Sequence, residues 1–163
     1  MNVGIQNNGL IFSLLLPTID YMEWYLQYED VDQKYREYRW LLQVFQSQEP
    51  AQRLTLKAPA HTGSLEVLTQ AVSEVMLIQT HRDLAACVSS ACSLVATYHR
   101  AVSNEVDLHA MADMTLALYE SWCRHSIAFH DAHPGLIYDV LYDDLVADPI
   151  GTVRGIYSHF GLP

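Results

Sequence analysis

Hydrophobic positions in the first third of the chain follow the period of a helix. Four of them recur at intervals of three or four residues: Tyr35, Tyr38, Leu42 and Phe45. This spacing predicts a helix from about residue 32 to 47 with one buried face. An earlier helix is expected to begin at Asp20, because Glu23 follows it at the spacing of a capping box. Pro50 ends this helical region, and residues 1–17 form an uninformative lead.

After residue 50 the pattern changes to strands that alternate with helices. Three short stretches are predicted as strands: residues 53–57 (RLTLK), 75–80 (VMLIQT) and 136–140 (LIYDV). The first alternates apolar and polar residues, as expected for a half-buried strand. The second is almost continuously apolar, which is typical of a strand buried on both faces of a parallel sheet.

The helices of this second part carry their own start and stop signals. Ser64, Asp83, Asp107 and Asp148 are the expected N-caps of four helices. The third of these helices is long and ends at His133-Pro134-Gly135, while the fourth has Pro149 at its first position and ends at Gly161.

Strands that alternate with helices predict crossover connections and a mostly parallel sheet. We therefore expect a three-layer α/β fold with a short sheet that is incomplete at its leading edge. A chain of 163 residues suits a single domain, and a composition that is 50% hydrophobic and 17% charged suits a packed core. The expected organisation is a lead (1–17), a helical region (18–48) and an α/β portion (53–163).

The net charge argues against a nucleic-acid partner, and the cysteine content indicates the cellular compartment. The net charge is -10 with nine Lys and Arg, which is too few for the basic face that a nucleic acid requires. Three cysteines without framework spacing indicate a reducing compartment. The apolar run at residues 10–17 lacks a preceding cationic region and is too short to span a bilayer. We expect a soluble, cytoplasmic protein with no membrane partner.

Two scarce cations follow predicted strands, Lys57 after the first and Arg82 after the second. Ligands of parallel sheets bind beyond the carboxyl ends of the strands. The Arg82 guanidinium can grip a phosphate with two parallel hydrogen bonds. The hydroxyl of Ser90, about two helical turns further on, could share that phosphate. The alternative is an arginine paired with a neighbouring carboxylate, such as that of Asp83, and a serine that only packs.

The segment K-A-P-A-H places His61 four residues after Lys57, across a proline turn. The lysine could stabilise negative charge on a transferring group, and the histidine could remove a proton from an acceptor. The alternative is a surface lysine and a loop histidine that caps the next helix, and this reading is favoured when the segment is taken alone.

Motifs of other protein classes, namely kinases, P-loop NTPases and metal-binding proteins, are incomplete in this sequence. H-R-D-L opens the protein-kinase catalytic loop, but Val88 stands where that loop needs asparagine, and no glycine-rich loop or Walker A sequence occurs. His130 and His133 lie three residues apart, but no further ligand completes a tetrahedral metal set. We expect no metal.

Four segments, in this order, resemble the PAPS-dependent sulfotransferase superfamily, in the branch with K-x-P-x-H and H-R-D-P segments. They are WLLQVFQ (40–46), LTLKAPAH (54–61), QTHRD (79–83) with Ser90 and Leu94, and YDVLYDDLVADPIGTVRGIYSHFGL (138–162). The resemblance implies a P-loop-NTPase-like sulfotransferase fold and PAPS (3′-phosphoadenosine-5′-phosphosulfate) as the co-substrate.

The resemblance also implies roles for five residues. Arg82 and Ser90 would hold the 3′-phosphate of PAPS, and Tyr142 would lie near the adenine. Lys57 would support the sulfuryl group, and His61 would deprotonate a hydroxyl or amine of a small-molecule acceptor whose identity the sequence does not reveal.

The sequence departs from the family pattern at two places. Leu84 stands where the family usually has proline, and nothing between Met1 and Pro17 resembles the glycine-rich loop that cradles the 5′-phosphosulfate. We therefore expect a middle piece of the enzyme, a sulfotransferase by resemblance. The alternative is a catalytically inactive fragment that acts only as a nucleotide-binding or interaction domain, and that could self-associate through its incomplete sheet edge.

Overall fold

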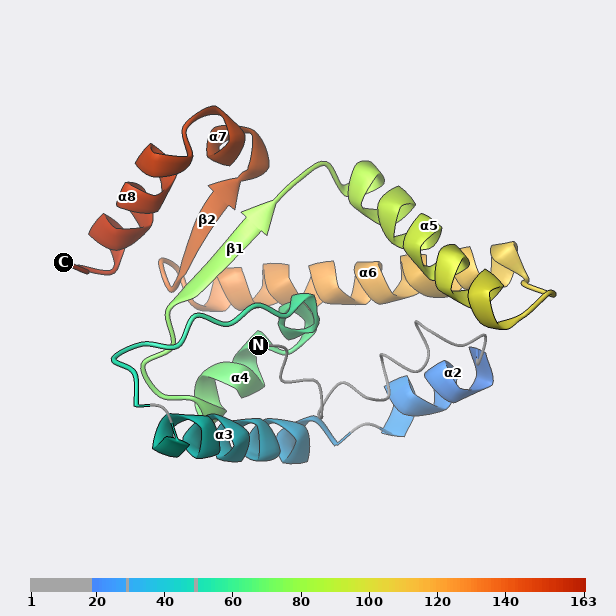
Figure 1. Ribbon diagram of the computed structural model, residues 1–163, viewed down its shortest axis with the longest axis horizontal. Helices are drawn as coiled ribbons and strands as arrows, with labels where there is room; N and C mark the ends of the chain where they lie inside the picture. The colour runs from blue at the N-terminus through green and yellow to red at the C-terminus, as the bar shows by residue number, and fades with distance from the viewer. Residues whose placement is uncertain (1–18, 29, 49) are drawn as a thin grey trace.

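The computed structural model describes residues 19–28, 30–48 and 50–163, so the predicted lead (1–17) lies outside the described residues (Figure 1). The elements follow in this order: α2 (Ile19–Tyr28), α3 (Val31–Gln48), the 3₁₀ helix η1 (Pro59–Gly63), α4 (Leu65–Ala71), β1 (Leu77–His81), α5 (Leu84–Val102), α6 (Leu108–Ala132), β2 (Ile137–Leu141), α7 (Tyr142–Ala147) and α8 (Pro149–His159).

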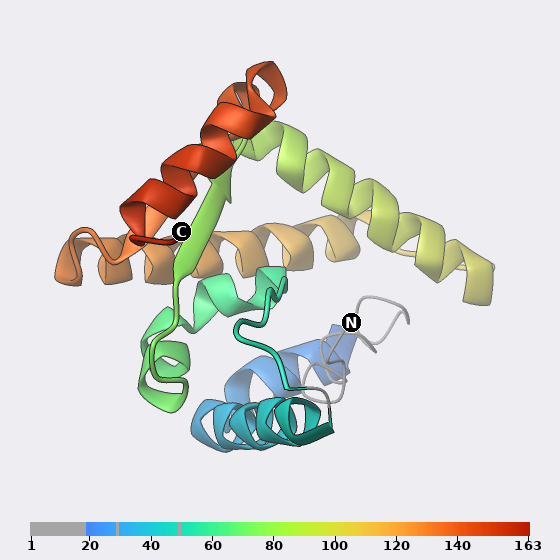
Figure 2. The ribbon, with the colours of Figure 1, turned by 60° about the vertical axis from the view of Figure 1, so that its left-hand side comes forward.

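The two strands pair in parallel, with Leu77 opposite Ile137 and His81 opposite Leu141. Helices α5 and α6 form the crossover between them, as a parallel pair requires. α6 covers one face of this sheet, where its Phe129 packs with Leu77 and Ile137. α8 covers the other face over β2 (Figures 1 and 2). The predicted α/β class with a short parallel sheet is confirmed.

Close packing of α8 on β2 depends on a glycine. A Cβ atom at Gly155 would collide with the hydroxyl of Tyr138, which points from β2 toward the helix. The absence of a side chain at this position therefore allows helix and strand to approach.

One predicted strand is absent, and a second, which forms β1, is less buried than predicted. Residues 53–57 form no strand, and Leu54 and Leu56 are both exposed. Their alternation would favour a strand only if one face were buried, and neither is. The second prediction had the strand at 75–80 buried on both faces, but Ile78 of β1 is 49% exposed. The reason is that α8 packs on β2, which leaves this face of β1 without a covering helix among the described residues.

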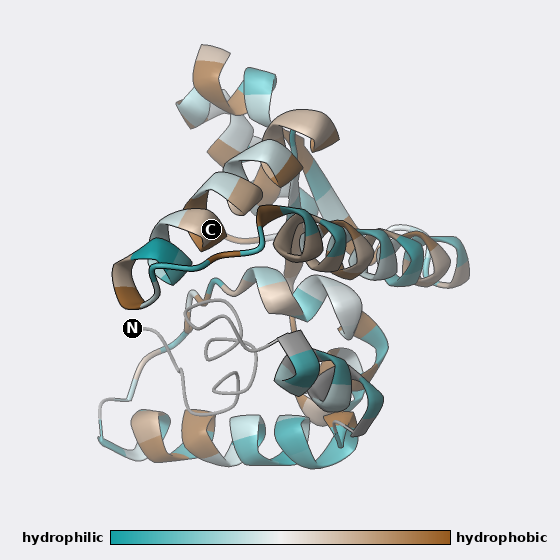
Figure 3. Cartoon of the chain, turned by 90° about the vertical axis from the view of Figure 1, so that its right-hand side faces the viewer, coloured by the Kyte–Doolittle hydropathy of each residue, from teal (hydrophilic) through white to brown (hydrophobic). Residues whose placement is uncertain are grey.

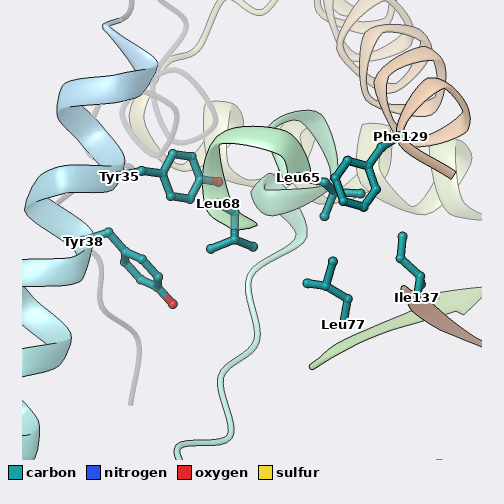
Figure 4. Close-up of a cluster of buried hydrophobic side chains, with 7 residues drawn as sticks. All are labelled: Tyr35, Tyr38, Leu65, Leu68, Leu77, Phe129 and Ile137. Atoms are coloured by element: carbon teal, nitrogen blue, oxygen red, sulfur yellow. The ribbon is translucent and has the colours of Figure 1, made fainter. Parts of the chain in front are cut away.

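The main hydrophobic core joins α3 and α4 to the sheet and α6 (Figure 4). Its buried members are Tyr35, Tyr38, Leu65, Leu68, Leu77, Phe129 and Ile137. Tyr35 and Tyr38 confirm the predicted buried face of the second helix. Burial of one such large side chain contributes about 1.5–3 kcal/mol, so this cluster holds the helical region against the α/β portion.

Three of the predicted aspartate caps are confirmed. Asp83 accepts a hydrogen bond from Ala86 N at 2.7 Å, and Asp107 and Asp148 make equivalent bonds at the starts of α6 and α8. Ser64 stands at the N-cap of α4, but its side chain makes no capping bond. Asp20 lies in the first turn of α2, which begins one residue earlier than predicted.

The described helices mix hydrophobic and hydrophilic residues along their length (Figure 3). None of these helices is both long enough and apolar enough to cross a membrane.

Candidate functional site

The carboxyl ends of the two strands lie side by side, where α5 and α7 begin (Figures 1 and 2). Arg82 directly follows β1, and Tyr142 directly follows β2. His81 is opposite Leu141 in the register. The residues that follow them, Arg82 and Tyr142, therefore leave the sheet side by side. The Arg82 Cζ atom lies 4.8 Å from the centroid of the Tyr142 ring, within the range of a cation–π interaction.

The Arg82 guanidinium has no carboxylate partner among the described residues. The alternative prediction paired it with Asp83, but that carboxylate instead accepts from the backbone of α5. Both Arg82 and Tyr142 are exposed. The strand end therefore presents a guanidinium that forms no ion pair with the described residues, so its donors are available to an anion.

Ser90 lies on an exposed position of α5, six residues after the first residue of that helix. Six residues of helix correspond to about 9 Å along the axis. No hydrogen bond joins its hydroxyl to Arg82 in the part of the chain that the structure describes. An anion that contacts both groups would therefore have to lie between them, along the first two turns of α5.

A polar network that the sequence analysis missed lies on the α6 face of the sheet. His81 Nε2 is 2.6 Å from Asp139 Oδ1, and His130 Nε2 is 3.2 Å from the same oxygen. Ser126 donates a hydrogen bond to Gln79 Oε1 at 3.0 Å. These bonds tie the strands to α6 just below the site. Polar residues at Gln79 and His81, two positions apart in an apolar strand, could have indicated that this face carries a polar network. Their partners Ser126 and Asp139 could not be predicted, because the sequence alone does not specify the strand register.

The other two candidate residues lie on a different part of the fold. Lys57 is exposed in a stretch without regular structure, so no strand carries it to the carboxyl edge of the sheet. His61 belongs to η1, which packs on α6 and α4. No hydrogen bond, ion pair or ring contact of the described residues joins either of them to Arg82, Ser90 or Tyr142.

The His61 ring is held by two core tyrosines of α3. Its Nδ1 atom and the Tyr35 hydroxyl are hydrogen-bonded at 2.8 Å, and its ring centroid is 5.2 Å from that of Tyr38. Burial, together with the nearby charge of Lys34, lowers the pKa of His61 to about 4. His61 is therefore neutral at pH 7, and its side chain does not cap α4 as the alternative prediction had it.

The histidines at the end of α6 have separate partners. His130 contacts Asp139, His133 contacts Glu66 at 2.8 Å, and His125 contacts the Ser121 carbonyl at 2.7 Å. Within residues 19–28, 30–48 and 50–163, no three His, Cys, Asp or Glu side chains are placed to hold a metal ion.

Comparison with known proteins gives the class of this chain. Residues 15–163 match the sequence profile of the Sulfotransferase family, and the chain belongs to that family. The structure is similar to the crystal structure of sulfotransferase STF9 from Mycobacterium avium, with a TM-score of 0.88 and 25% sequence identity. The match covers 95% of this chain and 40% of the solved chain. No curated protein matches the sequence. The resemblance seen in the sequence is confirmed.

Proposed function

We propose that this chain supplies the 3′-phosphate half of a PAPS site in a sulfotransferase that acts on a hydroxyl or amine of a small-molecule acceptor. Membership of the family supports the reaction class. The observation that carries the proposal is Arg82, a cation without a carboxylate partner in the described chain, at the carboxyl end of a parallel strand. Such strand ends are where parallel sheets bind ligands.

The residues present fit the phosphate end of the nucleotide. The Arg82 guanidinium can donate two parallel hydrogen bonds to one phosphate, and the Ser90 hydroxyl can donate a third. The positive end of the α5 dipole adds to the attraction. The described residues contain no glycine-rich loop for the 5′-phosphosulfate, so the proposal for these residues covers the 3′-phosphate half.

PAPS, when bound, supplies the sulfuryl group that is transferred. Lys57 would stabilise negative charge on that group, and no metal is needed for this role. His61 would accept the acceptor's proton through Nε2 in the tautomer whose Nδ1–H donates to the Tyr35 hydroxyl. A pKa of about 4 keeps the imidazole unprotonated at neutral pH but makes it a weak base. Either residue would have to reach the carboxyl edge of the sheet, which neither contacts here.

Binding of PAP, the desulfated product, tests the proposal by calorimetry on the purified chain. Charge-assisted hydrogen bonds contribute about 1.5–3 kcal/mol, so Arg82→Ala should weaken PAP binding by about ten- to a hundredfold. Ser90→Ala should weaken it less. The matched control is Arg124→Ala, which removes an exposed arginine that pairs with Glu120 on α6 and should leave binding unchanged. Absence of PAP binding by the unmodified chain, or equal binding by Arg82→Ala, contradicts the proposal.

A second candidate, an interaction domain that self-associates through the sheet, is favoured by one observation. Each strand has one partner in the described sheet, so its outer edge is unpaired there. Ile78 and Leu141 add apolar side chains that are 49% and 56% exposed. Unpaired edges of this kind favour pairing with another chain. Light scattering after size-exclusion chromatography should then show a dimer that Ile78→Lys dissociates. A monomer at all concentrations excludes this candidate.

A further inference from the structure

The contact between Arg82 and Tyr142 follows from the strand register. Because β1 and β2 are parallel and in step, the residues that follow them emerge at the same level of the sheet. Tyr142 is also the first residue of α7, so its backbone is fixed by both the strand and the helix. The ring is therefore placed beside the guanidinium by the fold, and the distance from Cζ to the ring centroid is 4.8 Å.

This contact leaves the hydrogen-bonding groups of Arg82 available. The five N–H donors of a guanidinium lie in its own plane and point outward. A cation–π contact of Cζ with an aromatic ring uses none of them. Stacking can instead reduce the number of conformations of a long, exposed side chain before any ligand arrives, which lowers the ordering cost of binding.

The geometry points to Tyr142 as a positioning residue that holds Arg82 ready for the 3′-phosphate. This inference rests on the proposed function, and it assigns Tyr142 a different role from that of an adenine contact. Two observations support it. The Tyr142 ring contacts the Arg82 guanidinium, and Arg82 has no ion pair in the described structure that could hold it instead. An exposed cation–π contact corresponds to about a two- to fivefold effect on affinity.

The two roles of Tyr142 predict different ligand selectivity. A positioning role acts only through the 3′-phosphate, so the loss of the ring should weaken PAP and leave AMP, which lacks that phosphate, unaffected. A direct adenine contact would act on both nucleotides alike. Tyr142→Phe keeps the aromatic face and should bind PAP as the unmodified chain does. Tyr142→Leu removes the face and should weaken PAP about two- to fivefold.

NMR titrations of both nucleotides test this, because they follow weak as well as strong binding. In an Arg82→Ala background, Tyr142→Leu should have no further effect on PAP, since its action passes through the arginine. The matched control is Tyr157→Leu, which removes a tyrosine of similar exposure on α8. Equal weakening of PAP and AMP by Tyr142→Leu, or additive effects with Arg82→Ala, overturns the inference.

A ligand-free readout separates failure of this inference from failure of the proposed function. The Arg82 side-chain methylene signals, identified by their loss in Arg82→Ala, should show a ring-current shift that is kept in Tyr142→Phe and lost in Tyr142→Leu. If PAP does not bind but the shift is present, the proposed function fails while the contact stands. If PAP binds but the shift is absent, only the positioning role of Tyr142 fails.

Discussion

The two groups of candidate residues differ in what fixes them. Arg82 and Tyr142 are exposed, yet their positions follow from paired strands whose carboxyl ends meet at one edge. His61 is half-buried and held by core tyrosines, while Lys57 four residues earlier lies on a stretch that pairs with no strand. A binding site can thus be placed by backbone pairing while its side chains stay in solvent, whereas core contacts can hold a side chain without bringing it to the site.

The sharpest test of this contrast is the loss of a core tyrosine. Tyr35 is 1% exposed and its hydroxyl contacts His61. Removal of a large buried aromatic side chain costs about 3–5 kcal/mol, so Tyr35→Ala should lower the free energy of unfolding by about that amount, as measured by urea denaturation. The exposed Arg82→Ala removes only the contact with Tyr142 and should change it by less than about 1 kcal/mol. Similar losses in both variants would remove the distinction between the regions.

The pH dependence of stability should report the burial of His61. Its pKa is lowered to about 4 in the folded chain from an ordinary value of 6.5, so between these pH values the unfolded chain binds the proton and the folded chain does not. Stability is therefore fully present above about pH 6.5 and is lost as pH falls toward 4. The shift corresponds to about 3 kcal/mol.

The measurement is a set of urea unfolding curves between pH 7.5 and 4, compared with those of His61→Asn. Asparagine can still form a hydrogen bond with Tyr35 but does not titrate in this range. The difference in stability between the two chains should shrink by about 3 kcal/mol as pH falls. A constant difference would show that His61 is as accessible to protons as an ordinary surface histidine.

Local signals explain which parts of the fold the sequence predicted. The aspartate caps at Asp83, Asp107 and Asp148 act on N–H groups two or three residues away, so their pattern is legible in the chain itself. The strand at residues 53–57 and the double-sided burial of Ile78 were wrong for a common reason. Both depend on which element covers them, and coverage is a tertiary property that alternation and apolar runs do not specify.

The candidate site also has one part that the sequence predicted and another that depends on tertiary structure. Arg82 was predicted at the end of a strand because a scarce cation followed an apolar run, and the structure places it there. Its contact with Tyr142 and the bonds of Asp139 to His81 and His130 were not foreseen. They arise from the register of two strands separated by two helices, which periodicity within either strand cannot reveal.

The smallest expected effect concerns the bonds beneath the site. Asp139 contacts His81 and His130 through one oxygen, and all three side chains are one-third or more exposed to solvent. Exposed ion pairs contribute about 0–1 kcal/mol, so Asp139→Asn should lower the free energy of unfolding by less than about 1 kcal/mol. PAP affinity should be unchanged, because the strand pairing that places Arg82 is a backbone property. A large loss of PAP binding with unchanged stability would instead show that the position of Arg82 depends on the side chain of its neighbour His81. Backbone pairing would then not be sufficient to place Arg82, and the contrast drawn with His61 would be wrong.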